Sequence, residues 1–147
     1  MGIPMAFAAV RGEVPSLAWV LRFANFFWVM AYDTEYATVD RDDDVVIGIK
    51  TSALFFGKFD VIAVAASYAS FLGIMAGIGL WQQFGIFYYA GLALATVLAI
   101  NHIWLIRGRD RTECFAVFRG NNLLGISVFI GVALDFAVRL KAWPQWY

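Results

Sequence analysis

Residues 61–106 contain no aspartate, glutamate, lysine or arginine. An uncharged stretch of this length exceeds what one buried helix needs, and it suits two membrane-spanning helices of about 20 residues each. The rest of the chain agrees, because 62% of its residues are hydrophobic and only 15% are charged, against about a quarter in soluble proteins. The pattern therefore predicts an all-α, integral membrane helix bundle. The net charge of zero gives no indication of a nucleic-acid partner.

We expect about four complete transmembrane helices, preceded by an N-terminal apolar stub over residues 1–10. The apolar runs are separated by segments that carry charge, glycine or proline, which are typical of turns and loops. Two of these segments, 33–58 and 107–119, are long and strongly charged, whereas the break at 81–84 is short and uncharged. The expected spans cover residues 17–32, 59–80, 85–106 and 121–138.

The basic residues predict an orientation in the bilayer. The segments 33–58 and 107–119 together hold seven of the eleven lysines and arginines, and the turn at 81–84 holds none. Lysine and arginine are enriched in cytoplasmic loops. We therefore expect both charged segments on the cytoplasmic side of the membrane.

Acidic residues are concentrated in residues 33–50, which hold five aspartates and one glutamate of the eleven acids in the chain. On an ideal helix, seven residues make about two turns and eleven make about three. Asp33, Asp40 and Asp44 would then lie in line on one face, with Tyr36 and Ala37 between them. Carboxylates in such a row repel one another unless a cation lies among them. Hard oxygen ligands of this kind suit Mg²⁺ or Ca²⁺.

The residues around this face predict a magnesium–diphosphate site at the membrane surface. Mg²⁺ typically binds one or two protein carboxylates and completes its octahedron with water and substrate phosphate. We therefore expect Asp40 and Asp44 to be the metal ligands and the catalytic pair. A substrate with a diphosphate head and a lipid tail would suit the position. The expected substrate contacts are Asp33, Tyr36, Arg41 and Lys50, with hydrogen bonds from Thr51 and Ser52.

A non-enzymatic alternative remains open, in which the row of aspartates is a divalent-cation site of a membrane scaffold. An EF-hand is excluded, because its sixth and twelfth positions would be Val45 and Thr51 instead of glycine and glutamate. We expect Asp42 and Asp43 to face solvent in a loop.

Several other polar, small and aromatic residues are expected to serve structure. His102 is predicted to pack against Asn101, and Asn121 to cap or join helices. Ala69, Gly73 and Gly77 recur every four residues and predict close helix packing. Six aromatic residues predict interfacial belts, namely Trp81, Phe87, Tyr88, Tyr89, Trp143 and Trp146.

Residues 32–57, YDTEYATVDRDDDVVIGIKTSALFFG, resemble the second aspartate-rich motif of the UbiA superfamily of membrane prenyltransferases. Within it, they are most similar to the 4-hydroxybenzoate polyprenyltransferases. The opening GIPMAFAAV and the later ECFAVFRGNN at 113–122 are also similar to that family, so the resemblance covers essentially the whole chain, 1–147.

The resemblance implies nine transmembrane helices around a cavity, in the inner membrane of a bacterium. Two cytoplasmic aspartate-rich motifs would bind Mg²⁺ and polyprenyl diphosphate, and Asp40 and Asp44 match the second motif. The implied reaction transfers a polyprenyl group to the ring of 4-hydroxybenzoate in ubiquinone biosynthesis. Other acceptors of the superfamily, homogentisate and haem, remain open.

The first motif of the superfamily, N-D-x-x-D-x-x-x-D, has no counterpart in this chain. We therefore expect the chain to be the C-terminal portion of one membrane domain. It would need an N-terminal half to complete its site, and it would be inactive alone.

Overall fold

The computed structural model describes residues 1–48 and 50–142, and for residues 42, 43, 141 and 142 it describes the backbone alone. Trp143 and Trp146, predicted to lie at the interface, are outside the described residues. Every regular element within the described ranges is a helix. The all-α prediction is therefore confirmed.

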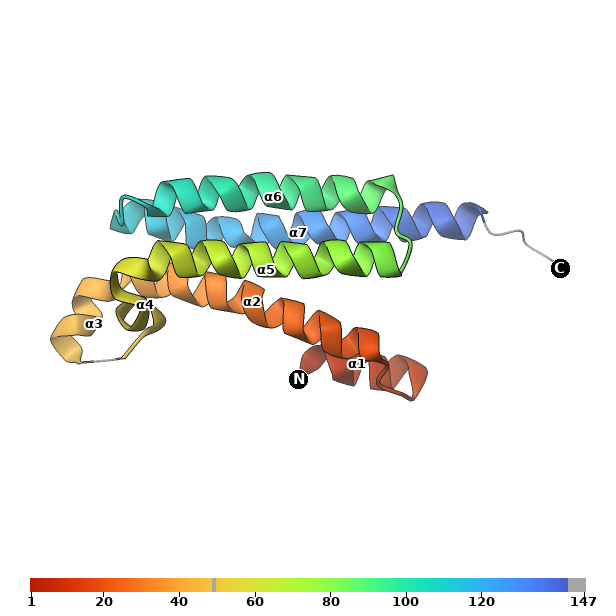
Figure 1. Ribbon diagram of the computed structural model, residues 1–147, viewed down its shortest axis with the longest axis horizontal. Helices are drawn as coiled ribbons and strands as arrows, with labels where there is room; N and C mark the ends of the chain where they lie inside the picture. Colours follow the sequence, from red (N-terminus) through yellow and green to blue (C-terminus); the bar gives the residue numbers. More distant parts are fainter. Residues whose placement is uncertain (49, 143–147) are drawn as a thin grey trace.

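Four long helices lie along the long axis of the molecule, with α6 and α7 side by side and α5 next to them (Figure 1). The short α1 packs against the start of α2, and α3 and α4 gather at one end of the bundle. In chain order the elements are α1 (Gly2–Arg11), α2 (Ser16–Val39), α3 (Arg41–Ile47), α4 (Ser52–Phe56), the 3₁₀ turn η1 (Gly57–Phe59), α5 (Asp60–Trp81), α6 (Ile86–Ile106) and α7 (Arg111–Ala142).

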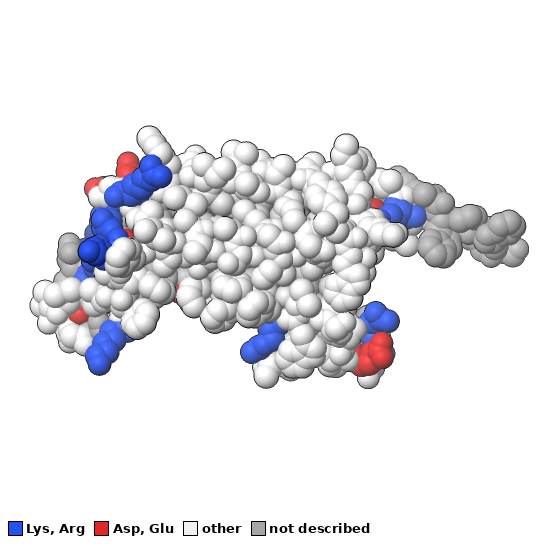
Figure 2. Space-filling model, in the orientation of Figure 1, with Lys and Arg blue, Asp and Glu red and all other residues white. Residues whose placement is uncertain are grey.

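Three helical stretches are long and apolar enough to cross a membrane, namely Ser52–Trp81, Ile86–Ile106 and Arg111–Leu140. The fourth expected span lies within α2, which has 24 residues but carries Arg22, Asp33 and Glu35. On the face shown in Figure 2, most charged side chains lie toward the two ends, and the broad surface between them is uncharged except at its lower edge. Only 28–33% of the most apolar window of each span is buried. These apolar outer surfaces identify an integral membrane protein.

The last span begins earlier than expected. We predicted a loop over 107–119, but α7 begins at Arg111. The Asp110 carboxylate accepts hydrogen bonds from the backbone N–H groups of Thr112 and Glu113, at 2.9 and 3.0 Å. A side chain that satisfies these otherwise unpaired donors starts a helix. The arginines that suggested a loop therefore lie in a four-residue connection, 107–110, and on the first turns of α7.

The acidic segment is less regular than one ideal helix. α2 ends at Val39, and Asp40 adopts φ −98° and ψ 7° before α3 begins. The Asp44 N–H still donates to the Asp40 carbonyl at 2.8 Å, so the acidic face bends without being interrupted. Gly48 and Gly57 end α3 and α4 with positive φ, which glycine adopts without steric cost. The two short helices themselves occupy a region predicted to be a loop.

The close helix packing also differs from the prediction. Gly73 and Gly77 face outward, and a Cβ atom on either would meet nothing within 4 Å. A close backbone approach joins α6 to α7 instead, where a Cβ on Gly91 would lie 2.6 Å from the Ser127 carbonyl oxygen. Tyr88 is likewise turned inward and donates to the Met75 carbonyl at 2.6 Å, so it is not part of an interfacial belt.

Candidate functional site

A hollow of about 430 Å³ opens where α2 bends into α3. It brings the three aspartates of the predicted row to one place, even though α2 ends before Asp40. Tyr36 and Ala37 lie between them, as the helical spacing predicts. The start of α4 forms another side of the hollow. Its lining residues are Asp33, Tyr36, Ala37, Asp40, Asp44, Thr51 and Ser52.

The donors in this hollow fit Mg²⁺ with a phosphate ligand. Asp44 is 9% exposed, and carboxylate and hydroxyl oxygens are the hard ligands that this ion prefers. The Thr51 hydroxyl oxygen is buried and has no hydrogen-bond partner. Within the described residues, no three acidic, histidine or cysteine side chains lie close enough to enclose a metal ion.

Tyr36 borders the hollow and is 46% exposed. Its phenol donates a hydrogen bond to the Asp40 carboxylate. This bond and the negative charges of Asp40 and Asp44 raise the pKa of the Tyr36 phenol. Tyr36 therefore stays neutral and remains a hydrogen-bond donor at the rim of the site.

Neither predicted cationic contact lines the hollow. Lys50 is exposed beside Thr51 in the chain. Arg41 points to Asp60 at the start of α5, with its Nη1 atom 3.0 Å from Oδ2. Asp60 is 2% exposed and also binds Arg109 through two bonds of 2.9 and 2.7 Å. These contacts of Asp60 with Arg41 and Arg109 connect α3 and the segment 107–110 to α5, next to the hollow.

A second group of polar side chains is buried inside the bundle. Glu35 and Asn121 are fully buried, and Tyr68 is 1% exposed. The Tyr68 hydroxyl donates to Glu35 Oε1 at 2.6 Å, and Asn121 Nδ2 donates to Glu35 Oε2 at 2.7 Å. His102 Nδ1 lies 3.2 Å from the Tyr68 hydroxyl. The network joins α2, α5, α6 and α7. His102 therefore pairs with Tyr68, and the predicted pairing with Asn101 is wrong. Of the two roles predicted for Asn121, it joins helices and does not cap one.

The Trp28 indole fixes the orientation of the Asn121 amide and, with it, the directions of the hydrogen bonds in this network. The Trp28 indole can only donate, and its Nε1 lies 2.7 Å from Asn121 Oδ1. That bond turns the Asn121 amide nitrogen toward Glu35 and the Tyr68 hydroxyl, at 2.7 and 2.8 Å. The single hydroxyl proton of Tyr68 is directed to Glu35, so His102 Nδ1 must carry the proton between the two groups. Tyr68 and Asn121 donate to Glu35 directly, and His102 and Trp28 are linked to it through Tyr68 and Asn121 respectively.

The UbiA prenyltransferase family matches residues 1–130. The chain belongs to the UbiA prenyltransferase family. The match includes the acidic hollow and all four helices of the buried network. No solved structure matches this UbiA chain.

Curated relatives of this UbiA chain are named 4-hydroxybenzoate octaprenyltransferase. The Paraburkholderia phymatum protein is 58% identical over 138 residues, which are 94% of this chain and 48% of that protein. The proteins from Paraburkholderia phytofirmans and Azoarcus sp. are 59% and 57% identical, over 92% and 93% of this chain and 47% and 48% of their own lengths. The chain spans about half the length of the curated relatives it matches.

Sequence reasoning on this UbiA chain missed Glu35, Tyr68 and Asp60. Glu35 lies among the acids of the predicted motif, and Asp60 precedes an apolar run, so nothing nearby in the sequence marks their partners. The helical spacing contained one usable signal, since Glu35 lies about 200° from Asp33 around α2. That offset places Glu35 on the face opposite the hollow, toward the other helices.

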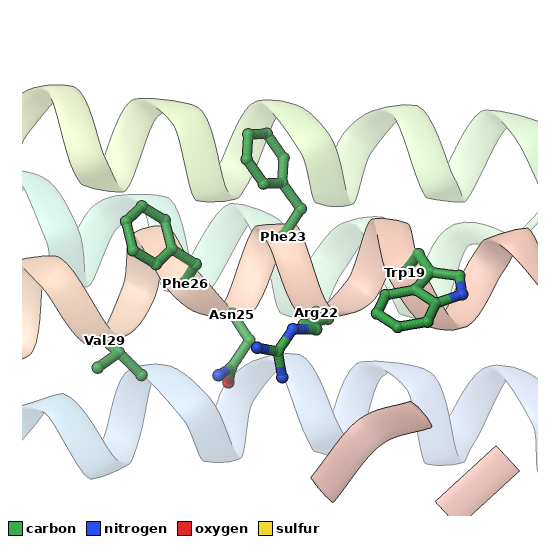
Figure 3. A pocket seen from close by; sticks show the side chains of 6 residues that line it. All are labelled: Trp19, Arg22, Phe23, Asn25, Phe26 and Val29. Carbon is green, nitrogen blue, oxygen red and sulfur yellow. The ribbon is translucent and has the colours of Figure 1, made fainter. Parts of the chain in front are cut away.

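A larger hollow of about 490 Å³ lies on the outer face of α2, away from the acidic end. Figure 3 shows its aromatic and polar side chains projecting from successive turns of that helix. The Arg22 guanidinium reaches the Met1 sulfur at 3.3 Å. The lining residues are Trp19, Arg22, Phe23, Asn25, Phe26 and Val29. Without acids to bind a metal, this hollow is not the candidate site.

Proposed function

We propose that this chain contributes the second aspartate-rich half of the site of a membrane prenyltransferase. The enzyme transfers a polyprenyl group from polyprenyl diphosphate to 4-hydroxybenzoate in ubiquinone biosynthesis. One observation carries the proposal: relatives with this name are 57–59% identical over more than nine-tenths of the chain. The hollow that gathers Asp33, Asp40 and Asp44 supports it chemically.

In this proposal Asp40 and Asp44 would hold Mg²⁺, which would supply positive charge to the departing diphosphate. The hydroxyls of Thr51 and Ser52 donate to diphosphate oxygens, and Lys50 supplies positive charge from the rim. Asp33 and Tyr36 complete the wall of the site. Arg41 acts indirectly, because its ion pair with Asp60 holds α3 in place.

The allylic C–O bond breaks with its electron pair leaving on the diphosphate. The carbon ortho to the hydroxyl of 4-hydroxybenzoate supplies the electrons of the new C–C bond, and the ring then loses the proton from that carbon. Aromatic side chains beside the hollow favour the developing allylic cation through cation–π attraction. Tyr36, which lines the hollow and packs on Phe118 with ring centroids 4.9 Å apart, is the aromatic side chain placed for this role.

We propose that the hollow faces the cytoplasm of a bacterial inner membrane. The connection 107–110, α3 and α4 lie at one end of the bundle, and the turn between α5 and α6 lies at the other (Figure 1). The seven basic residues of the two charged segments belong to the first end. Positive residues mark the cytoplasmic side.

Cysteine labelling tests this orientation. Gln83→Cys lies on the exposed turn between α5 and α6 and should react with a membrane-impermeant maleimide added to intact spheroplasts. Gly108→Cys at the opposite end should react only after the membrane is opened. The native Cys114 is buried and gives little background. The reverse labelling pattern would place the acidic hollow outside the cell.

Activity in membranes tests the reaction. Membranes from cells that lack the endogenous enzyme receive Mg²⁺, a polyprenyl diphosphate and radiolabelled 4-hydroxybenzoate. The chain alone should give no product, because one pair of aspartates would bind too few Mg²⁺ ions to neutralise a diphosphate, which carries about three negative charges. Co-expression with a family segment that carries the first aspartate-rich motif should give prenylated 4-hydroxybenzoate.

Two outcomes would contradict this proposal. Product from the chain alone would refute the requirement for a second motif. No product from the co-expressed segments, with both present in the membrane, would refute the proposed reaction.

A further inference from the structure

The start of α5, the short helix α3 and the connection 107–110 lie at the same end of the bundle (Figure 1). Asp60 opens α5 and is 2% exposed. Each of its two carboxylate oxygens accepts two hydrogen bonds. Oδ1 accepts from the Val61 N–H and from Arg109 Nη2, both at 2.7 Å. Oδ2 accepts from Arg109 Nε at 2.9 Å and from Arg41 Nη1 at 3.0 Å.

We propose that Asp60 and Arg109 are positioning residues of the acidic hollow. Asp60 binds Arg41, which is the first residue of α3 and follows Asp40 in the chain. This contact fixes α3 and therefore the place of Asp44 relative to Asp40. The inference rests on the proposed function, since that function assigns both aspartates to Mg²⁺. It makes the metal site depend on Arg109, which comes from the connection between α6 and α7 and does not line the hollow.

The short helix α3 needs such a contact because its apolar side chains do not anchor it. It has seven residues, and helices shorter than about 12 residues are marginal by themselves. Val45, Val46 and Ile47 are 61%, 85% and 69% exposed, so they bury little surface against the bundle. Among the side chains of α3 that the structure describes, Arg41 provides the hydrogen bond to α5. Loss of that bond would leave α3 free to move with its metal ligand.

The geometry at Asp60 makes the position of Arg41 depend on Arg109. An ionised carboxylate has about four lone-pair sites, and in Asp60 all of them are occupied. Arg109 binds both oxygens, which fixes the plane of the carboxylate and directs the remaining site of Oδ2 to Arg41. A buried charge that loses one partner must find another donor. Loss of Arg109 therefore reorients Asp60 and weakens its hold on Arg41.

The backbone of Arg109 supports a specific role for its side chain. Arg109 has φ 51°, a left-handed conformation that is uncommon for residues other than glycine. Its N–H closes the end of α6 by donating to the Ile106 carbonyl at 3.0 Å. Glycine would adopt this turn at lower cost, so the turn alone does not explain an arginine. The guanidinium also donates to the Lys58 carbonyl at 3.2 Å, which adds a second contact to the start of α5.

A spin label on α3 tests the positioning role without requiring the reaction. Val46→Cys carries a nitroxide at an exposed position of α3, and the native Cys114 is buried. The chain is reconstituted in lipid nanodiscs, and electron paramagnetic resonance measures the mobility of the label without metal. In the unlabelled chain, the same method measures binding of Mn²⁺, a hard cation that replaces Mg²⁺, in the presence of a non-hydrolysable prenyl thiodiphosphate.

Two pairs of variants separate positioning from stability. Asp60→Asn and Arg109→Gln each remove one member of the hydrogen-bonded group, and Arg109→Gln leaves Asp60 with Arg41 as a partner. Asp135→Asn is the control for Asp60. Asp135 is also buried, accepts a backbone N–H and pairs with an arginine, but it lies at the turn between α5 and α6. Arg107→Gln is the control for Arg109, because it removes the same charge from the same connection at an exposed position.

We expect Asp60→Asn and Arg109→Gln to increase the mobility of the label. They should also weaken Mn²⁺ binding by about tenfold or more, as is typical when residues that hold metal ligands are lost. Arg109→Lys keeps the charge without the planar fork and should give a smaller effect. Both controls should leave the mobility and the affinity unchanged.

An unchanged label in both Asp60→Asn and Arg109→Gln would overturn the proposal, because α3 would then be held by other contacts. A mobile label with unchanged Mn²⁺ affinity would also overturn it, as would the absence of Mn²⁺ binding to the unmodified chain. Equal mobility in Asp135→Asn would indicate a general loss of the fold and would count against a specific role.

This test and the membrane assay can fail separately. Label mobility and Mn²⁺ affinity that depend on Asp60 and Arg109, together with no prenyl transfer by the co-expressed segments, would refute the reaction and retain the positioning role. Prenyl transfer with label mobility that depends on neither residue would do the reverse.

Discussion

Asp40→Asn and Asp44→Asn will each abolish prenyl transfer in membranes that contain this chain together with the first aspartate-rich motif. Both side chains line the hollow beside the buried Thr51 hydroxyl. An amide has the size of the carboxylate but no charge, so it binds Mg²⁺ weakly and leaves the diphosphate charge uncompensated. Since metal stabilisation of a leaving group provides several kcal/mol, the rate should fall by about a hundredfold or more.

A matched variant separates loss of the metal from loss of the fold. Asp43→Asn removes one negative charge from the same short helix, α3, at a position that the sequence predicts to face solvent. It should retain most of the activity. Binding of a prenyl thiodiphosphate should require Mg²⁺ in Asp43→Asn and lose that dependence in Asp40→Asn and Asp44→Asn. Near-normal turnover in Asp40→Asn or in Asp44→Asn would contradict the assignment of these aspartates as metal ligands.

Asn121→Ala will destabilise the bundle far more than Asn122→Ala. Asn121 is fully buried and donates to Glu35 and Tyr68 while accepting from Trp28. Its truncation leaves a buried carboxylate oxygen and an indole N–H without partners. Removing one member of a buried charged network costs about 3–5 kcal/mol, and hydrogen bonds within membranes average lower, about 0.6–2 kcal/mol. We expect a loss of about 2–4 kcal/mol, between these limits.

Asn122→Ala is the control because Asn122 is exposed on the next position of α7. Its effect should stay within about 0.5 kcal/mol, as for most surface substitutions. Unfolding of both variants by SDS in mixed micelles measures the free energies. Asn121→Asp should be worse than Asn121→Ala, because it sets a second carboxylate against Glu35. Equal stability of the Asn121 and Asn122 variants would show that the buried network contributes little.

The short-range features of the fold were predictable because each depends on neighbouring residues. The uncharged stretch 61–106 predicted two spans, and α5 and α6 cover it apart from the turn at 82–85. The spacing of Asp33, Asp40 and Asp44 predicted a shared face, and the hollow contains all three. The prediction failed where one side chain changed the local outcome. Asp110 caps α7 and so starts a helix within a segment whose arginines suggested a loop.

The amino-acid sequence by itself determined a membrane helix bundle with an acidic end, because hydropathy and helical periodicity act over neighbouring residues. Only the tertiary structure decided which polar groups meet across the bundle. Glu35 and Asn121 are 86 positions apart and Arg109 and Asp60 are 49 apart, yet each pair forms hydrogen bonds. A charge inside the bundle must find its partner wherever the packed helices place one, since water is excluded there. That requirement turned Arg41 and Arg109 toward the buried carboxylate of Asp60.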